Sequence, residues 1–326
     1  MAAAAAAAAR FPAGRYLAHA ASGAMTPSVA LVSPEWLAAH LGSVTVLDAS
    51  WQMPAARRSG AAEHAAGPRI PGSVHFCLDT ISDTSSSLPH MLPSPAAFGA
   101  AAARLGISHA RPVVVYNSLG LFSSPRVWWT LRAFGHQAAA VLDGGLPAWL
   151  EAQLPVEVGA SAAPAAVVPE EAWALDAAMV ADLAAVSAAS KRAAEAGGQP
   201  AAVLVDARSS DRFAGDTPEP REGLRSGHMP GSCNLPFGKL IEAGGTGYGC
   251  ARLLGEAALA AEFEAAGVAV DAPQRIITTC GSGVTAAVLT LALVLCGRPQ
   301  SATSLYDGSW AEWGSRADTH VVTGRA

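Results

Sequence analysis

The sequence predicts an α/β protein made of two tandem copies of one domain, each copy a mainly parallel sheet flanked by helices. Three observations support this. The same landmarks occur twice in the same order, short Val/Ile runs alternate with helical stretches, and a Pro/Ala/Gly-rich interval separates the copies. At 326 residues the chain is also long enough for two domains that each bury a core.

The duplication rests on four landmarks that share residue types and order. They are an apolar run ending in Asp (44–50 and 202–209), a Pro-Gly turn (70–76 and 229–236), a β-branched run entering a small-residue loop (112–120 and 275–283) and an Asp-Gly turn beside Trp (141–149 and 305–313). The spacings agree as well, because Asp48 precedes Gly72 by 24 residues and Asp206 precedes Gly231 by 25. Such agreement indicates a repeated domain.

The interval between the copies has the composition of a linker. Residues 155–169 are rich in Pro, Ala and Gly and carry little charge. We therefore expect an N-terminal domain over 31–155, a linker over 156–168 and a C-terminal domain over 169–320.

Within each copy the apolar pattern alternates between strands and helices. Residues 95–106 and 256–267 have the apolar periodicity of helices, and each segment ends in glycine. The runs between such segments are short and rich in Val and Ile. This alternation predicts a parallel sheet whose ligand site lies beyond the carboxyl ends of the strands.

The first thirty residues resemble a targeting segment. They are rich in Ala, contain Arg10, Arg15 and His19, and precede the first acidic residue, Glu35. An acid-poor, Arg-containing start is typical of an organelle transit peptide, and an alanine-rich disordered leader is the alternative. Residues 1–30 are therefore expected to precede the folded domains. The expected location is mitochondrial, with a plastid or the cytoplasm as alternatives.

Charge and hydropathy exclude several classes of partner. The formal net charge is -5, with 21 Lys and Arg against 26 Asp and Glu, so no nucleic-acid partner is expected. The longest apolar stretch, 284–296, has thirteen residues, whereas a membrane-spanning helix needs about 20. We expect no membrane association, and we expect this stretch to be a buried helix ended by Gly297 and Pro299.

The cysteines suggest neither cross-links nor a metal site. They lie at positions 77, 233, 250, 280 and 296, an odd number without the spacing of zinc ligands or of a disulfide framework. No metal or organic cofactor is expected. Cys77, Cys233, Cys250 and Cys296 are expected to be structural, because none has a strand–turn–helix setting.

Cys280 does have that setting. A strand over 276–279 gives way to a glycine-containing turn and then to a helix from Val284 onward. Amides of residues 281–286, together with the positive end of the helix dipole, can stabilise a thiolate at this place. Cys280 is therefore the candidate nucleophile.

The segment CGSGVTA at 280–286 closely resembles the active-site loop of the 3-mercaptopyruvate sulfurtransferases, and the doubled domain resembles the tandem rhodanese architecture. The resemblance runs from about 31 to 316. Further similar segments are HMLP (90–93), SPRVWWTLRAFGH (124–136), LDGGL (142–146), DRFAGDTPEPREG (211–223) and YDGSWAEW (306–313). In that family only the C-terminal domain carries the reactive cysteine, and the first-half loop at 116–123 has none.

The resemblance implies partners for the cysteine. Arg212 and Arg221 match positions that bind the substrate's carboxylate and carbonyl, a role that suits the planar, permanently charged guanidinium. Asp79, His90 and Ser282 match a proposed proton-handling relay. Because Asp79 and His90 belong to the first copy, the site is expected in a cleft between the domains.

The two positions after the cysteine predict the sulfur donor. Relatives that prefer thiosulfate, a dianion, carry basic side chains there, whereas this chain has Gly281 and Ser282. A small neutral loop leaves room for a carbon-bearing donor, so 3-mercaptopyruvate is the expected donor and thiosulfate the alternative. Gly281, Gly283, Val284 and Thr285 are expected to contact the donor.

The implied reaction is nucleophilic. The Cys280 thiolate attacks the donor's sulfur, pyruvate leaves as its enolate, and the cysteine becomes a persulfide. An acceptor thiol, such as thioredoxin or a small thiol, or else cyanide, then removes the outer sulfur.

Two other classes of protein share this kind of fold. A phosphatase of related fold needs a longer loop with an arginine at its end to bind phosphate, and residues 281–286 contain no arginine. A non-enzymatic rhodanese-like binding module is the remaining alternative, but such modules have lost the cysteine that this chain keeps.

Overall fold

A computed structural model of the chain describes residues 30–159, 167–194, 201–243 and 251–325. The expected leader up to residue 29, residues 160–166 of the expected linker, and Cys250 lie outside these ranges.

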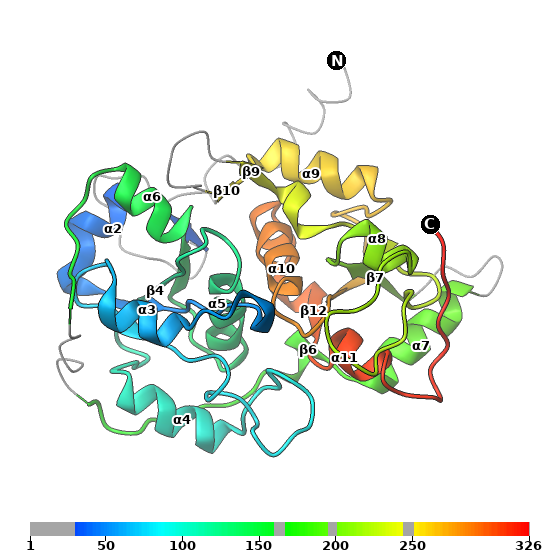
Figure 1. Cartoon of the computed structure of the whole chain (residues 1–326), viewed down its shortest axis with the longest axis horizontal. Coiled ribbons are helices and arrows are strands. Elements are labelled where there is room, and N and C mark those ends of the chain that lie inside the picture. The colour runs from blue at the N-terminus through cyan, green and yellow to red at the C-terminus, as the bar shows by residue number, and fades with distance from the viewer. Residues whose placement is uncertain (1–29, 160–166, 195–200, 244–250, 326) are drawn as a thin grey trace.

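Five parallel strands form the sheet of the first half, in the order β1-β5-β4-β2-β3 (Figure 1). The strands are β1 (Leu31–Val32), β2 (Thr45–Asp48), β3 (Val74–His75), β4 (Val113–Tyr116) and β5 (Ala139–Leu142). The accompanying helices are α2 (Pro34–His40), α3 (Gly60–Ala66), α4 (Pro95–Arg104), α5 (Ser124–Ala133) and α6 (Gly145–Glu151).

The second half repeats this arrangement strand for strand, in the order β6-β12-β11-β7-β8. Its strands are β6 (Val180–Ala181), β7 (Ala202–Asp206), β8 (Cys233–Asn234), β11 (Arg275–Thr279) and β12 (Thr303–Tyr306). Its helices are α7 (Leu183–Ala194), α8 (Ser210–Ala214), α9 (Glu256–Ala265), α10 (Ala286–Leu295) and α11 (Ser309–Trp313). The predicted fold class, two α/β domains with mainly parallel sheets, is confirmed.

The remaining elements are short. The second half adds an antiparallel pair, β9 (Ile241–Ala243) and β10 (Ala251–Leu253). Single 3₁₀ turns are η1 (Leu41–Ser43), η2 (Pro54–Ala56), η3 (Ala177–Met179), η4 (Phe237–Leu240) and η5 (Gln300–Ala302). Within the described ranges, no helix has both the length and the apolar character needed to cross a bilayer.

Both faces of the sheets are buried, which explains why the central strands are apolar without interruption. In β4, Val113 and Val115 pack into the larger core cluster, while Val114 and Tyr116 pack on the opposite face with Trp149. β-branched side chains suit such doubly covered strands.

The helices begin and end largely where the sequence predicts. α4 begins after the N-cap Ser94, whose hydroxyl accepts from the amide of Ala97, and α9 ends just before Gly267. α10 ends at Leu295, just before the predicted Gly297 in its left-handed conformation, but it begins at Ala286 rather than Val284. Residues 284–285 form a turn in which the Ala287 amide donates to the Val284 carbonyl (3.3 Å), a 3₁₀-type bond that delays the α-helix.

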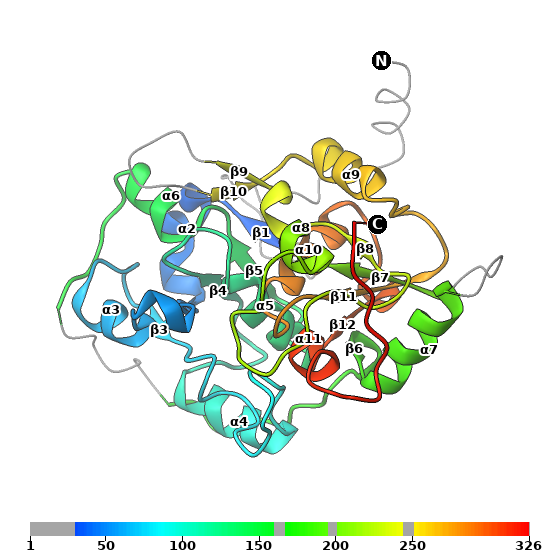
Figure 2. The same ribbon diagram turned by 45° about the vertical axis from the view of Figure 1, so that its right-hand side comes forward.

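The two halves meet along α5 and α10, which lie side by side between the sheets (Figures 1 and 2). Two equivalent carboxylates bind backbone across this interface. Asp143, after β5, accepts from the Leu253 amide (3.1 Å), and Asp307, after β12, accepts from the Leu92 amide (2.7 Å). In both copies, the aspartate of the duplicated Asp-Gly landmark therefore accepts a hydrogen bond from the backbone of the other domain.

Candidate active site

Cys280 directly follows β11 at the carboxyl edge of the second sheet, as the sequence predicts. It is buried, with 2% of its surface exposed. The start of α11 holds its backbone, because its amide donates to Oγ of Ser309 (3.3 Å) and its carbonyl accepts from the Trp310 amide (2.9 Å). The sulfur atom is therefore carried on a rigid support.

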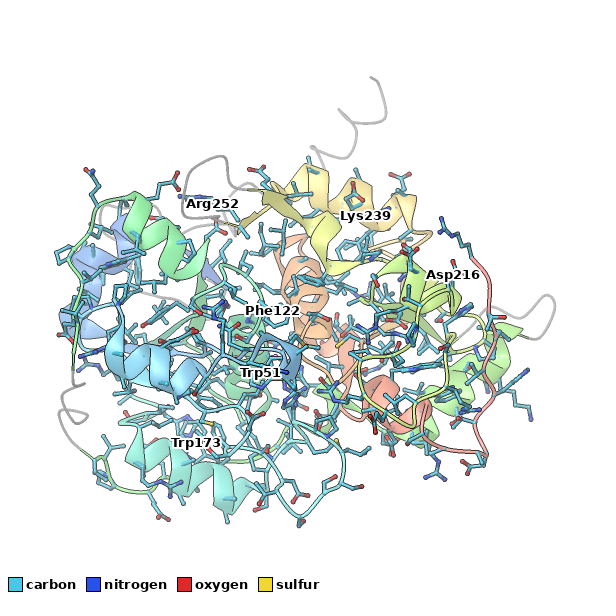
Figure 3. All side chains as sticks on the ribbon, viewed as in Figure 1. Trp51, Phe122, Trp173, Asp216, Lys239 and Arg252 are labelled. Atoms are coloured by element: carbon cyan, nitrogen blue, oxygen red, sulfur yellow. The ribbon has the colours of Figure 1, made fainter. Side chains whose placement is uncertain are left out.

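A cavity of about 230 Å³ adjoins Cys280, and both domains line it. The first domain contributes apolar side chains from two loops, and the second contributes the catalytic loop and three arginines. The lining residues are Trp51, Met53, Phe122, Ala207, Arg208, Ser209, Arg212, Arg221, Phe237, Cys280, Gly281, Ser282, Val284 and Thr285. Figure 3 shows Trp51 and Phe122 in the central region where the domains meet.

The predicted loop residues lie around this cavity. Gly281, Val284 and Thr285 line it, whereas Gly283 adopts a φ of +77° and lies against the first domain. A Cβ atom on Gly283 would lie 2.5 Å from Nη1 of Arg126, so glycine is required there by both conformation and space.

The three predicted relay residues are in contact across the domain boundary. Nδ1 of His90 lies 3.1 Å from Oγ of Ser282, and Nε2 lies 3.2 Å from Oδ1 of Asp79. The hydrogen bond from His90, followed by that from the Trp51 indole, lowers the pKa of Asp79, although burial opposes this.

This geometry sets the direction of the hydrogen bonds. An ionised Asp79 can only accept, so Nε2 of a neutral His90 carries the proton and Nδ1 accepts from the Ser282 hydroxyl. The Asp79 side chain is 62% exposed, so the relay runs from the buried cavity to solvent.

Both predicted arginines lie beside the catalytic loop. A Cβ atom on Gly281 would lie 3.1 Å from Nη2 of Arg212 and 3.9 Å from Nη1 of Arg221. Nη2 of Arg221 also lies 3.5 Å from Oγ of Ser282. Burial lowers the pKa of Arg221, and the charge of Cys280 is the largest opposing cause.

The two arginines differ in how they are held. Arg212 donates through Nη2 (2.5 Å) and Nε (3.2 Å) to Glu219, whose side chain is 1% exposed. Glu219 also accepts from Arg208 (2.8 Å), which is paired with Asp206. Together with Arg221, these side chains carry three positive and two negative charges, which leaves one positive charge beside the cavity before the Cys280 thiolate is counted.

A family model described as a rhodanese-like domain matches residues 33–152 and 189–316, once in each half. The chain belongs to the rhodanese-like family. A curated relative, "3-mercaptopyruvate sulfurtransferase" of Escherichia coli K12, is 38% identical over 297 residues, covering 89% of this chain and 96% of the relative. "Thiosulfate/3-mercaptopyruvate sulfurtransferase 1, mitochondrial" of Arabidopsis thaliana is 37% identical over 325 residues, covering 91% and 79%.

A solved structure agrees with these relatives. The crystal structure of SseA from Escherichia coli, whose title describes 3-mercaptopyruvate sulfotransferases, matches with a TM-score of 0.73 and 35% identity. The match covers 86% of this chain and 98% of that one. The shared rhodanese-like fold therefore extends over both domains.

Sequence reasoning missed the aromatic wall of this rhodanese-like site. Trp51 stacks on Phe122, with ring centroids 6.1 Å apart, and Phe122 lies 5.9 Å from Phe237. Trp51 follows directly after the landmark 44–50, at the carboxyl end of a strand. That position is a usable signal, but no local pattern shows that it faces the second domain.

Sequence reasoning also missed Glu219, although the residue lies within the recognised segment 211–223. A glutamate two residues before Arg221 resembles an ordinary surface charge until the fold places its carboxylate in the interior.

The other described cysteines are free thiols with no comparable surroundings. Burial raises the pKa of Cys233 and raises that of Cys296 to about 12, so both remain protonated near neutral pH. Cys77 is partly buried. Among the described residues, no group of three or more His, Cys, Asp and Glu side chains is arranged to bind a metal ion.

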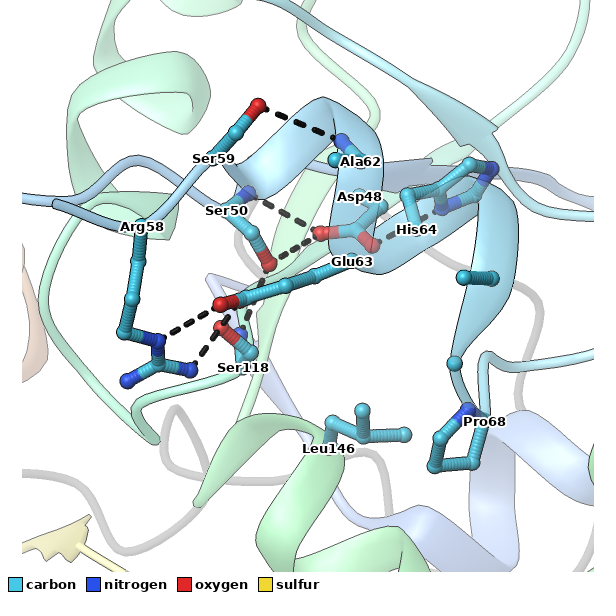
Figure 4. Close-up of a pocket in the computed structure, with 12 residues that line it drawn as sticks. Asp48, Ser50, Arg58, Ser59, Ala62, Glu63, His64, Pro68, Ser118 and Leu146 are labelled. Carbon is cyan, nitrogen blue, oxygen red and sulfur yellow. Dashed lines mark hydrogen bonds and ion pairs between the residues drawn. The ribbon is translucent and has the colours of Figure 1, made fainter.

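The first domain has a larger cavity, about 570 Å³, at the same edge of its own sheet (Figure 4). Asp48 there accepts from the Ser50 amide (2.9 Å) and lies 2.8 Å from Nδ1 of His64. Arg58 is paired with Glu63 at 2.5 Å. The position that corresponds to Cys280 is Asn117, which has no thiol.

Proposed function

We propose that this chain is a sulfurtransferase that takes sulfur from 3-mercaptopyruvate and carries it as a persulfide on Cys280. The observation that carries the proposal is the common cavity. Cys280 lies in it with the side chains of Arg212 and Arg221, and Ser282 links it to His90 and Asp79. The names of the curated relatives in Escherichia coli and Arabidopsis support the same donor.

Each group has a role that its chemistry supports. The arginines bind the donor's carboxylate and carbonyl and orient its sulfur toward Cys280. The thiolate attacks that sulfur, the new S–S bond forms, and the C–S bond breaks with its electron pair going to carbon. The resulting enolate of pyruvate takes up a proton at carbon, and Cys280 is left as a persulfide.

The charge around the cavity supports mercaptopyruvate over thiosulfate. Arg212 and Arg221 suit the single carboxylate and the carbonyl of mercaptopyruvate, and Gly281 and Ser282 add no further cation for a dianion. Thiosulfate is therefore the alternative, slower donor.

The second half of the reaction needs a thiol acceptor, such as thioredoxin or a small thiol, with cyanide serving in its place in an assay. We further propose domain limits of 31–155 and 169–320, joined by the linker 156–168. The proposed location is mitochondrial, with a plastid or the cytoplasm as alternatives, because one relative is named as mitochondrial and another is bacterial.

Intact mass spectrometry tests the proposal directly. Incubation with 3-mercaptopyruvate and removal of excess donor should leave the protein heavier by one sulfur atom, and later addition of cyanide should reverse the gain. The Cys280→Ser protein, treated alike, should gain nothing. A wild-type mass that stays unchanged would favour a binding module, and an equal gain in the serine variant would place the persulfide on another cysteine.

A further inference from the structure

A buried ion pair lies directly behind the relay, between the two domains. Arg126 on α5 has a side chain that is 1% exposed, and its Nη2 lies 2.6 Å from Oδ1 of Asp307, which follows β12 and is also buried. The guanidinium packs over the ring of Trp129 at 4.6 Å. Buried charges persist when they are paired and hydrogen-bonded, so their further contacts show what the pair holds.

Those further contacts are all with the backbone of the two catalytic loops. Arg126 donates through Nη2 to the His90 carbonyl (2.5 Å) and through Nη1 to the Gly283 carbonyl (3.4 Å). Asp307 accepts from the Leu92 amide (2.7 Å) with its second oxygen. One ion pair therefore binds the relay loop at two points and the cysteine loop at a third.

The relay loop needs such support, because His90 has a φ of +63°. Residues with a side chain rarely adopt this left-handed conformation unless surrounding contacts impose it. The bonds to the His90 carbonyl and to the Leu92 amide both hold the backbone that directly follows the Cα atom of the strained residue. Within this conformation, the imidazole reaches Ser282 of the other domain at 3.1 Å.

We propose that Arg126 and Asp307 are positioning residues that keep His90 in reach of Ser282 and so control proton transfer to the enolate. This rests on the proposed function, in which attack by Cys280 breaks the C–S bond. The Ser282 hydroxyl takes up the donor's thiol proton as it gives its own proton to Nδ1 of His90, and the imidazole then returns that proton through Ser282 to the enolate carbon. Sulfur transfer from thiosulfate releases sulfite and needs no proton on carbon.

Comparing the activities with the two donors therefore distinguishes a positioning role from general structural support. With cyanide as acceptor, Asp307→Asn should lower kcat for mercaptopyruvate by roughly tenfold or more, the scale of a disturbed proton transfer. The kcat/KM for thiosulfate should change by less than about threefold, because its reaction bypasses the relay. The amide oxygen of asparagine can still accept from Leu92, so the loop keeps one of its supports.

Asp143→Asn is the matched control. Asp143 occupies the equivalent Asp-Gly turn, is buried, and binds the Leu253 amide across the same interface, but its hydrogen bonds are with Leu253 and Gly144 rather than with the loops of His90 and Cys280. This variant should leave the turnover of both donors unchanged. If Asp307→Asn does not fold, as judged by circular dichroism, the double variant Arg126→Met/Asp307→Leu replaces it and leaves neither charge unpaired.

A double-mutant cycle with His90→Ala completes the test. Once His90 is removed, adding Asp307→Asn should cost little further mercaptopyruvate activity, because both changes act through the same imidazole. Equal losses for both donors, or a loss in Asp143→Asn as large as in Asp307→Asn, would show that the pair only supports the interface and would overturn the proposal.

Failure of the relay itself has a different signature. If His90→Ala turns over mercaptopyruvate as fast as the wild type, the relay of the proposed function is wrong and the positioning role is lost with it. If His90→Ala is slow while Asp307→Asn is normal, the relay stands and only the positioning role fails.

Discussion

The carboxyl edges of the two sheets carry equivalent loops but differ in the residue that follows the central strand. In the first domain, Asn117 occupies the place of the cysteine, and its Oδ1 accepts from the amides of Phe122 (3.3 Å) and Ser124 (3.2 Å) and from the Ser124 hydroxyl (2.7 Å). The donors of that loop therefore satisfy an amide oxygen of the loop itself. In the second domain, Cys280 takes this position, and its sulfur is a much weaker acceptor.

The two edges also differ in where their charged side chains lie. At the first edge, Asp48 contacts His64 and Ser50, and the Arg58–Glu63 pair lies at the surface with the arginine side chain 47% exposed. At the second edge, Asp206 and Glu219 are interior and fix arginines beside the loop. The comparison teaches that the duplicated scaffold supplies the loop, whereas the nucleophile and the buried arginines supply the chemistry.

The largest expected effect comes from removing the nucleophile. Cys280→Ser should abolish sulfur transfer while leaving the circular dichroism spectrum unchanged, because a hydroxyl is a far weaker nucleophile than a thiolate near neutral pH. Cys233→Ser is the control and should retain activity. Residual turnover within tenfold of the wild type would reject Cys280 as the nucleophile.

The first domain sharpens this test. Asn117→Cys, added to Cys280→Ser, should not restore transfer, because Arg58, the one arginine among the described residues that line the first cavity, is engaged with Glu63. Restored turnover with mercaptopyruvate would show that the cysteine alone distinguishes the two edges and would make the arginines dispensable.

The next effect comes from the arginines. Arg212→Ala and Arg221→Ala should each lower kcat/KM for mercaptopyruvate roughly ten- to a hundredfold, the loss expected for a charge-assisted contact of about 1.5–3 kcal/mol. Arg212→Ala should also lower the melting temperature by about 2–4 °C, since it removes one of the two arginines that pair with Glu219. Unchanged kcat/KM in both variants would exclude a carboxylate-binding role.

The donor loop should give an intermediate effect. Gly281→Arg combined with Ser282→Lys should move the ratio of the two kcat/KM values toward thiosulfate, because close charge pairs attract the dianion more strongly. The position of Arg212, 3.1 Å from a Cβ at residue 281, means that the new arginine must displace it, which weakens mercaptopyruvate binding further. A ratio that stays constant would show that the donor is selected elsewhere.

Much of this architecture is predictable from the sequence for local reasons. The helix ends at Gly267 and Gly297 follow from the left-handed conformation that glycine accepts, and the fully buried β4 follows from its run of Val residues. Cys280 is predictable from its strand–turn–helix setting. Arg221 and His90 are predictable only through segments that resemble a family, because their contacts join parts of the chain far apart in sequence.

The contacts that could not be predicted join residues that are widely separated in sequence. The Arg126–Asp307 pair joins residues 181 positions apart, and neither segment has a sequence pattern that predicts its partner. The aromatic wall and the interior position of Glu219 likewise depend on how the two domains pack. Such contacts become visible only when both sheets are in place.

The smallest expected effect is a pH-dependent difference in stability between variants of the two interface carboxylates, Asp143 and Asp307. Burial raises the pKa of Asp143 from its usual 3.8 to about 6, and the amide of Leu253 and the charge of Arg252 only partly oppose this. A raised pKa means that the folded state favours the protonated form. Its contribution to stability is therefore complete below about pH 3.8 and is lost as the pH rises through about 6.

Asparagine resembles the protonated form at every pH. Asp143→Asn should therefore be more stable than the wild type at pH 7, with a free energy of unfolding higher by about 3 kcal/mol at most, and the difference should nearly vanish below pH 4. Asp307→Asn should instead be less stable than the wild type at pH 7, because it leaves the buried Arg126 without its anion. Thermal unfolding of both variants across this pH range checks the comparison. If Asp143→Asn is destabilised at pH 7 as strongly as Asp307→Asn, then Asp143 is held as a carboxylate, and the two sides of the interface are electrostatically alike.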